Sequence, residues 1–137
     1  TDLIKRRFVI GSFSLLSANQ DEMFSRAQKA RRLIVNKMNE FFDSFDYFIT
    51  PAAFSLPKKI CDLSTAWSTN PDFLDNIMTI GNFGGYPSIT LPMMKEDGIP
   101  VGVNVTGRVF EDGAVLALAD EIQNLTGLKN LTAKEVK

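Results

Sequence analysis

Few side chains in this sequence could serve as a nucleophile or a base, because the 137 residues include no histidine and a single cysteine, Cys61. Without histidine, neither a Ser-His-Asp nor a Cys-His mechanism can operate within the chain, and a histidine metal site or a zinc knuckle is impossible. Lys58 and Lys59 could activate the Cys61 thiol, but an inert cysteine is the better interpretation. Thr1 could act as an N-terminal nucleophile only at the start of a buried strand, and the charged sequence after it argues against one. The chain alone therefore carries no credible catalytic set.

The most informative segments are rich in glycine and proline. Gly81–Pro92 and Gly98–Gly107 together hold most of the nine glycines and three of the six prolines. Glycine at strand ends indicates that backbone must come close to something, either other backbone or a ligand. Gly81–Gly85 precedes a strand and not a helix, so it does not form the phosphate-binding loop of a P-loop or dinucleotide site.

Helical periodicity predicts the elements that flank these segments. We expect one helix from Ile4 to about Leu16, and a long second helix whose N-cap is Ser17 or Asn19. Asn70-Pro71 is a strong helix start that predicts a helix to about Thr79. The last helix is expected over 112–125, with Gly127 at its C-terminal stop. The tail, 128–137, is polar and expected to be frayed.

The long second helix has two distinct faces. Apolar side chains recur at helical spacing and predict a stripe that faces a core, namely Phe24, Ala27, Ala30, Ile34, Met38, Phe41 and Phe45. Basic side chains occupy the other faces, namely Arg26, Lys29, Arg32 and Lys37. They could contact tRNA, but a solvated helix surface is the favoured interpretation.

Strands are predicted at Asp46–Pro51, Ser88–Leu91 and Val101–Val105, with a loop over 52–69. A turn at Glu96–Gly98 makes the last two strands an antiparallel hairpin. Strands separated by helices predict one α/β domain over residues 1–137, with a mixed β-sheet covered by helices. Three strands are few for so many amphipathic helices, so we expect the sheet to continue in residues that this chain lacks.

Net charge, hydropathy and cysteine content restrict the partners and the cellular compartment that we expect for this protein. The formal net charge of −1 provides no global attraction to nucleic acid or to an anionic membrane. No apolar run approaches the ~20 residues of a membrane span, and the N-terminus lacks the layout of a secretory signal. A single cysteine excludes an internal disulfide and favours a reducing compartment. We therefore expect a cytoplasmic protein, and the start at Thr1 suits a piece of a longer one.

Four motifs occur in an order and spacing that resemble the C-terminal part of the amidase-signature family. They are Arg6-Arg-Phe-Val-Ile-Gly-Ser-Phe13, Ala27-Gln-Lys-Ala-Arg31, Phe45-Asp-Tyr-Phe-Ile-Thr-Pro51 and the block 81–107. Within that family, the arginine-pair opening is similar to the A subunits of tRNA-dependent amidotransferases. The resemblance covers roughly residues 4–127. The usual Gly-Leu-Gln of the second strand is here Gly102-Val-Asn104, and the proline-rich turn after the first strand is reduced to Pro51-Ala-Ala-Phe54.

This resemblance implies a glutaminase whose Ser–cis-Ser–Lys triad lies outside the chain. The ammonia would pass to a partner subunit that uses ATP and Mg²⁺ to amidate mischarged tRNA, so B and C subunits are implied and tRNA contact is indirect. Arg7 would hold the α-carboxylate of glutamine and Asp75 its α-ammonium, and no cofactor is expected in this chain. Guanidinium–carboxylate and carboxylate–ammonium pairing suits these roles. Both residues could instead be ordinary helix charges, and Asp72 competes with Asp75.

Two other interpretations stay open. The chain could derive from another amidase-signature hydrolase that acts on a different amide. It could also be a non-enzymatic interaction module that uses the same α/β packing.

Overall fold

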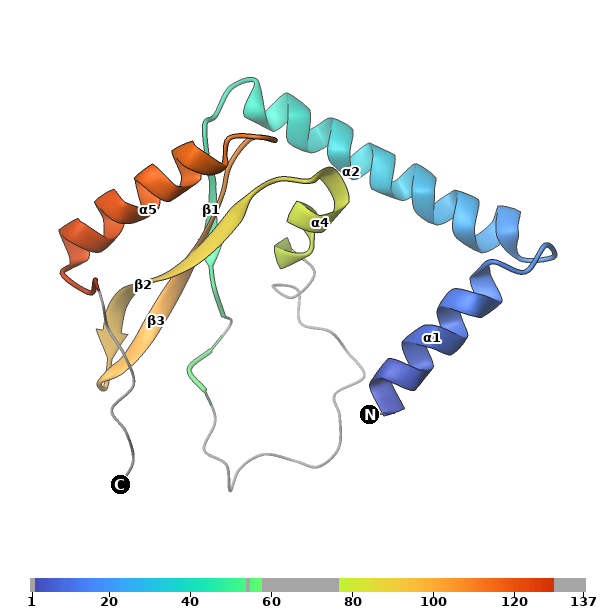
Figure 1. The fold of residues 1–137 in the computed structure, drawn as a ribbon, viewed down its shortest axis with the longest axis horizontal. Helices are drawn as coiled ribbons and strands as arrows, with labels where there is room; N and C mark the ends of the chain where they lie inside the picture. Colours follow the sequence, from blue (N-terminus) through green and yellow to red (C-terminus); the bar gives the residue numbers. More distant parts are fainter. Residues whose placement is uncertain (1, 54, 58–76, 130–137) are drawn as a thin grey trace. The chain divides into compact units, whose positions relative to one another are not determined.

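The computed structural model describes residues 2–53, 55–57 and 77–129 (Figure 1). The chain divides into two compact units, Thr1–Phe41 and Phe42–Lys137, and each is described by itself. Most of the predicted loop over 52–69 and of the predicted helix over 70–79 lies outside the described residues, as do Cys61 and the tail from residue 130 onward.

The first unit consists of helices. α1 spans Asp2–Ser14 and α2 spans Arg26–Phe42, so both predicted helices are confirmed. The second begins differently from the prediction, because Gln20–Ser25 forms a π-helical segment, η1, directly before α2. Its wider turn carries the acidic side chains Asp21 and Glu22, which favour a helix N-terminus.

Asn19 has a different role from the one its position suggests. It occupies the N-cap position of η1, but its side chain makes no capping hydrogen bond to that helix. Its Nδ2 atom donates instead to the backbone oxygen of Phe13, at 3.0 Å. The side-chain cap predicted for Asn19 was therefore wrong: Asn19 adds a second hydrogen bond to the carbonyl of Phe13, which also accepts from the backbone N–H of Leu16 at 3.3 Å.

The predicted apolar stripe of α2 is buried only toward the C-terminal end of the helix. Met38 is buried and Ile34 is half-buried, whereas Phe24, Ala27 and Ala30 are exposed. The basic residues on the other faces are exposed, as expected of a solvated surface. Two ion pairs cross one helical turn here, Arg26–Glu22 at 3.9 Å and Lys37–Glu40 at 2.6 Å. Exposed pairs of this kind contribute little to stability.

The second unit is built on a three-stranded sheet in the order β1-β3-β2. β1 spans Phe48–Pro51, β2 Ser88–Glu96 and β3 Ile99–Thr106. Both pairs are antiparallel, so a parallel pair of the predicted mixed sheet is not present among the described strands. The short helix α4, Ile80–Gly84, leads into β2. Helices and sheet together confirm the α/β class.

The predicted hairpin between β2 and β3 is confirmed, and its strands are longer than expected. Asp97 and Gly98 form the turn with φ values of 49° and 79°. A two-residue turn with positive φ at both positions matches the right-handed twist of the strands, and Asp-Gly is suited to it. The ladder is irregular between Pro92 and Met94, where proline cannot donate a hydrogen bond. The strand continues past this bulge, which is why its predicted end at Leu91 was too early.

The core of the second unit lies between the sheet and α5, Asp112–Thr126. α5 lies along one face of the sheet (Figure 1). Leu91, Val105 and Ala119 form the buried cluster, and the side chain of Val105 is fully buried. Gly107 allows this approach, because a Cβ there would lie 2.4 Å from Cγ2 of Val115. α5 ends at Gly127, which has a φ of 66°, as predicted.

Arg108 links the exit of β3 to the segment that follows α2. Its Nε donates to the backbone oxygen of Phe42 at 3.0 Å, and its Nη2 donates to the backbone oxygen of Phe45 at 3.4 Å. Nη2 also pairs with the carboxylate of Asp46 at 3.0 Å. A guanidinium is well suited to the carbonyls that a helix C-terminus leaves unpaired. The helix ends at Phe42, so Phe45, the last residue of the predicted stripe, lies outside it and is exposed.

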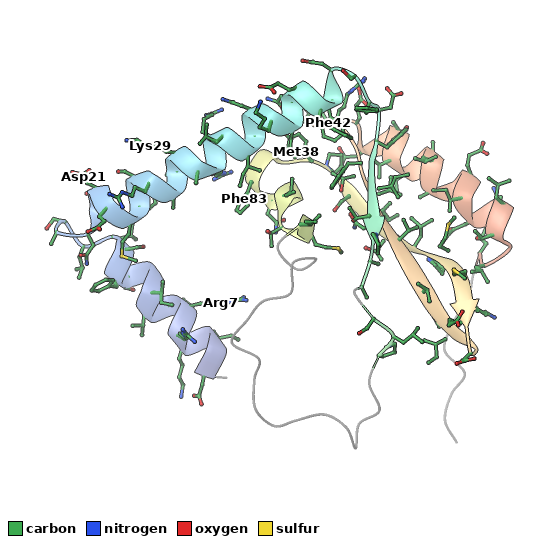
Figure 2. All side chains as sticks on the ribbon, turned by 180° about the vertical axis from the view of Figure 1, so that it is seen from behind. Arg7, Asp21, Lys29, Met38, Phe42 and Phe83 are labelled. Atoms are coloured by element: carbon green, nitrogen blue, oxygen red, sulfur yellow. The ribbon has the colours of Figure 1, made fainter. Side chains whose placement is uncertain are left out.

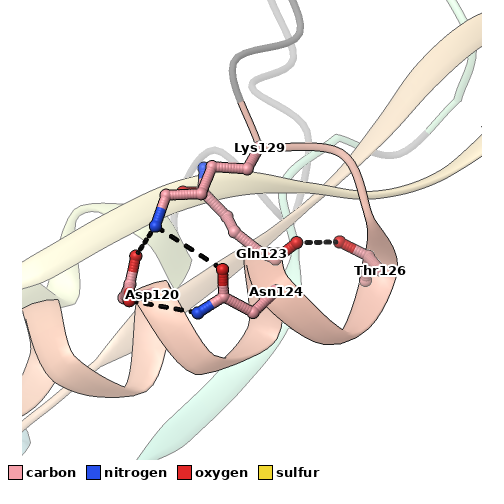
Figure 3. A network of polar contacts seen from close by, with 5 residues as sticks. All are labelled: Asp120, Gln123, Asn124, Thr126 and Lys129. Carbon is pink, nitrogen blue, oxygen red and sulfur yellow. Dashed lines mark hydrogen bonds and ion pairs between the residues drawn. The ribbon is translucent and has the colours of Figure 1, made fainter.

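A polar network fixes the chain at the C-terminal end of α5 (Figure 3). Lys129 pairs with the carboxylate of Asp120, and Nδ2 of Asn124 donates to the same carboxylate at 3.1 Å. The Oγ1 of Thr126 donates to the backbone oxygen of Gln123 at 3.3 Å. The hydrogen bond and charge of Lys129 lower the pKa of Asp120. These contacts hold residues 127–129 against the helix that they follow.

Candidate functional site

Arg7 lies in the middle of α1, and its side chain is exposed. Figure 2 shows it extending away from the helix. A planar guanidinium in this setting can pair with a carboxylate through two parallel hydrogen bonds. Arg6 precedes it on the same helix, but successive helical residues point about 100° apart, so the two cannot serve one ligand in the same way.

Asp75, the predicted partner of the ammonium group, lies outside the described residues, and so does its competitor Asp72. Of the two predicted substrate contacts, the structure therefore describes Arg7. The pairing of Arg7 and Asp75 around one ligand stays a prediction.

Packing within the chain explains Gly84 in the glycine-rich segment. Gly84 ends α4, and Gly85 follows with a left-handed φ of 75°. A Cβ on Gly84 would lie 2.1 Å from Cε2 of Tyr86. The Tyr86 ring is buried and packs against Phe42, with ring centroids 5.3 Å apart. The sequence predicted close approach to other backbone or to a ligand here, and at Gly84 the structure shows close approach to the side chain of Tyr86 instead.

A polar row crosses the sheet on the face opposite α5. Asn104 pairs in register with Thr50 of β1 and Thr90 of β2, so these three side chains share a face. Its Nδ2 donates to Oγ1 of Thr90 at 3.0 Å, and its Oδ1 accepts from Oγ1 of Thr106 at 3.2 Å. Asn104 and Thr106 are buried. Asn104 stands where the family pattern has glutamine, and its amide here ties β2 to β3.

Among the described residues, no group of three or more histidine, cysteine, aspartate or glutamate residues could hold a metal ion. The pKa of Tyr86 is raised by burial, which keeps its phenol protonated and does not activate it. No helix within this part of the chain is long and apolar enough to cross a bilayer.

Two structural residues escaped the sequence interpretation. Arg108 gave no local signal, because its partners lie more than sixty positions away. Phe110 combines a positive φ of 67° with a side chain that is 93% exposed. A bulky residue in the left-handed region is strained by roughly 1–3 kcal/mol. Neither the residue type of Phe110 nor the sequence around it predicts that conformation.

The chain is similar to known proteins over nearly its whole length. A sequence model of the amidase family matches residues 1–116. The A subunit of glutamyl-tRNA(Gln) amidotransferase from Ehrlichia canis (strain Jake) is 31% identical over 126 residues, which are 90% of this chain and 25% of that protein.

Two solved structures share the fold. The crystal structure of the glutamyl-tRNA(Gln) amidotransferase A subunit from Thermotoga maritima superposes with a TM-score of 0.64 at 34% identity, covering 98% of this chain and 28% of that one. A bacterial aryl acylamidase of the amidase signature family superposes with a TM-score of 0.63 at 24% identity, covering 84% and 24%, and shows the fold alone. The chain thus spans about a quarter of the length of these relatives.

Proposed function

The chain belongs to the amidase family, and we propose that it is the glutamine-recognition and scaffold part of the glutaminase (A) subunit of a tRNA-dependent amidotransferase. Such a protein releases ammonia from glutamine, and the ammonia converts Glu-tRNA(Gln) to Gln-tRNA(Gln). The observation that carries the proposal is the similarity to A subunits over nearly all of this chain. The arginine pair on α1 lies inside the similar region and supports it.

The proposed chemistry of recognition follows from the charges of glutamine. Its α-carboxylate pairs with the guanidinium of Arg7, and its α-ammonium pairs with the carboxylate of Asp75. Two opposite charges at fixed positions select a free amino acid over a neutral amide and orient the side-chain amide toward the nucleophile. Arg7 supports this role because its side chain is exposed among the described residues, and a guanidinium suits a planar anion.

The bond-breaking chemistry comes from elsewhere in the longer protein. In the proposed mechanism a Ser–cis-Ser–Lys triad attacks the side-chain amide of glutamine, forming an acyl-enzyme and releasing ammonia. B and C subunits complete the enzyme, and ATP and Mg²⁺ act at the partner subunit that receives the ammonia. Contact with tRNA is indirect, and the complex works in the cytoplasm. This chain supplies Arg7 and Asp75 to the recognition of glutamine.

A chimera tests the proposal. The segment of the Thermotoga maritima A subunit that matches this chain is replaced by residues 1–137, and the hybrid is assayed with its partner subunits. We expect glutamine hydrolysis and glutamine-dependent amidation of Glu-tRNA(Gln). A hybrid that hydrolyses an aryl acylamide but not glutamine would contradict the proposal and favour another amidase. A soluble hybrid without either activity would favour a non-enzymatic module.

A further inference from the structure

Two consecutive methionines, Met93 and Met94, expose their side chains on β2. Their exposed fractions are 50% and 53%, whereas Met23 is 39% exposed and Met38 is 8% exposed. Methionine usually fills irregular gaps in a protein core. Neither Met93 nor Met94 belongs to the core cluster between the sheet and α5. Packing in that core therefore does not explain this pair, and its two sulfur atoms are open to reagents in solvent.

The backbone of β2 accounts for the exposure of two neighbouring side chains. Pro92 pairs in register with Gly102 and Met94 pairs with Val101, so Met93 is the extra residue of the bulge. A regular strand sends successive side chains to opposite faces, and a bulge re-aims a side chain. The ladder is already interrupted at Met93, so a polar group added there does not break a regular pairing.

We propose that Met93 and Met94 form a site of reversible oxidation by peroxide. The thioether sulfur attacks one oxygen of the peroxide, the O–O bond breaks, and an S=O bond forms. Sulfur loses two electrons to the peroxide, and the second oxygen leaves as water after it takes up the proton of the transferred hydroxyl. The product, methionine sulfoxide, is polar, and methionine sulfoxide reductases restore the thioether, one class of enzyme for each epimer.

Burial determines what the added oxygen does to the protein. At Met93 and Met94 the sulfoxide oxygen can be hydrated, because half of each side chain is exposed. At Met38 the same oxygen would be buried without a hydrogen-bond partner, which destabilises a fold. The pair on β2 can therefore be oxidised and reduced while the protein stays folded.

Peroxide treatment of the 137-residue chain, followed by mass mapping of its peptides, tests the site. With hydrogen peroxide, Met93 and Met94 should each gain one oxygen at least about tenfold faster than Met38, because a buried thioether reacts only after local opening. Met23 should react at an intermediate rate. In denaturant, all of these methionines should react at one rate, since the difference comes from the fold. Treatment with both classes of reductase should remove the oxygens added at Met93 and Met94.

A Met93→Leu/Met94→Leu double variant is the matched control. Leucine has a similar volume, so the variant should fold, and it should lose the two fast sulfoxides and keep the slow one at Met38. The urea midpoint of the wild-type chain should be nearly the same before and after oxidation of the pair. Oxidation of Met38 or Met23 ahead of the pair in the folded chain would overturn the inference. Unfolding that accompanies the first two sulfoxides would overturn it too. None of these measurements depends on glutaminase activity, so they leave the proposed function untouched.

Discussion

Gly84→Ala should destabilise the sheet unit. The added methyl carbon would lie 2.1, 2.6 and 2.8 Å from three atoms of the Tyr86 ring. The ring cannot move freely, because it is 5% exposed and packs against Phe42. Overpacking of this kind costs about 1–3 kcal/mol, whereas alanine gains about 0.5–1 kcal/mol over glycine in a helix. We therefore expect a net loss of up to about 2.5 kcal/mol in the free energy of unfolding.

Urea unfolding of the 137-residue chain, followed by circular dichroism at one protein concentration, measures this loss. Gly113→Ala is the matched control, because no atom lies within 4 Å of its added Cβ, and it should be neutral or stabilising. In a Tyr86→Ala background, Gly84→Ala should lose its penalty and become neutral or stabilising as well. The same penalty with and without the tyrosine ring would refute the packing explanation.

The remaining predictions concern activity, surface and charge. The chain alone should release no ammonia from glutamine, because it lacks the nucleophile and base that the family requires; turnover that scales with the chain through two unrelated purification steps would contradict this. At micromolar concentration the chain should self-associate or bind a hydrophobic dye, because α1 exposes large apolar side chains and, among the described strands, β1 and β2 lie at the edges of the sheet; a monomer by light scattering without dye binding would favour an independent module. Lys129→Ala should raise the pKa of Asp120 toward 3.8, as measured by an NMR titration of its carboxyl group. Because the folded-state pKa of Asp120 is lowered, its ion pair with Lys129 stabilises the folded state above the unfolded-state pKa. This stabilisation is lost as the pH falls through the folded-state pKa, so wild type and variant should converge in stability in acid.

Local sequence signals predicted the elements whose structure depends on nearby residues. Asp97-Gly98 specified the hairpin, because that pair accepts positive φ at both turn positions. Gly127 specified the end of α5 for the same physical reason. Helical periodicity predicted α1, α2 and α5. These inferences needed only period and turn chemistry.

The features that the sequence did not reveal depend on contacts between distant segments. The end of α2 at Phe42 is stabilised by Arg108, which no local pattern links to it. Asn19 carries the signature of an N-cap, but the reversal of the chain presents the carbonyl of Phe13 to it instead. The role predicted for Arg7 came from a family resemblance and not from the neighbouring residues, because an arginine in a predicted helix gives no functional signal by itself. The structure gives it a neighbourhood of exposed apolar residues, which a solvated helix would not have.

The central claim is that Arg7 and Asp75 bind the two charged ends of glutamine, and the KM for glutamine tests it most directly. The assay uses the chimera with its partner subunits, comparing Arg7→Ala with Arg6→Ala and Asp75→Asn with Asp72→Asn. Removing one partner of a desolvated charge pair costs about 2–5 kcal/mol, and about 1.4 kcal/mol corresponds to a factor of ten. Arg7→Ala and Asp75→Asn should each raise the KM for glutamine at least about tenfold, while ammonia-dependent amidation, which bypasses the pocket, stays nearly unchanged. Equal effects of the controls and the targets would contradict the account and reduce both residues to ordinary helix charges.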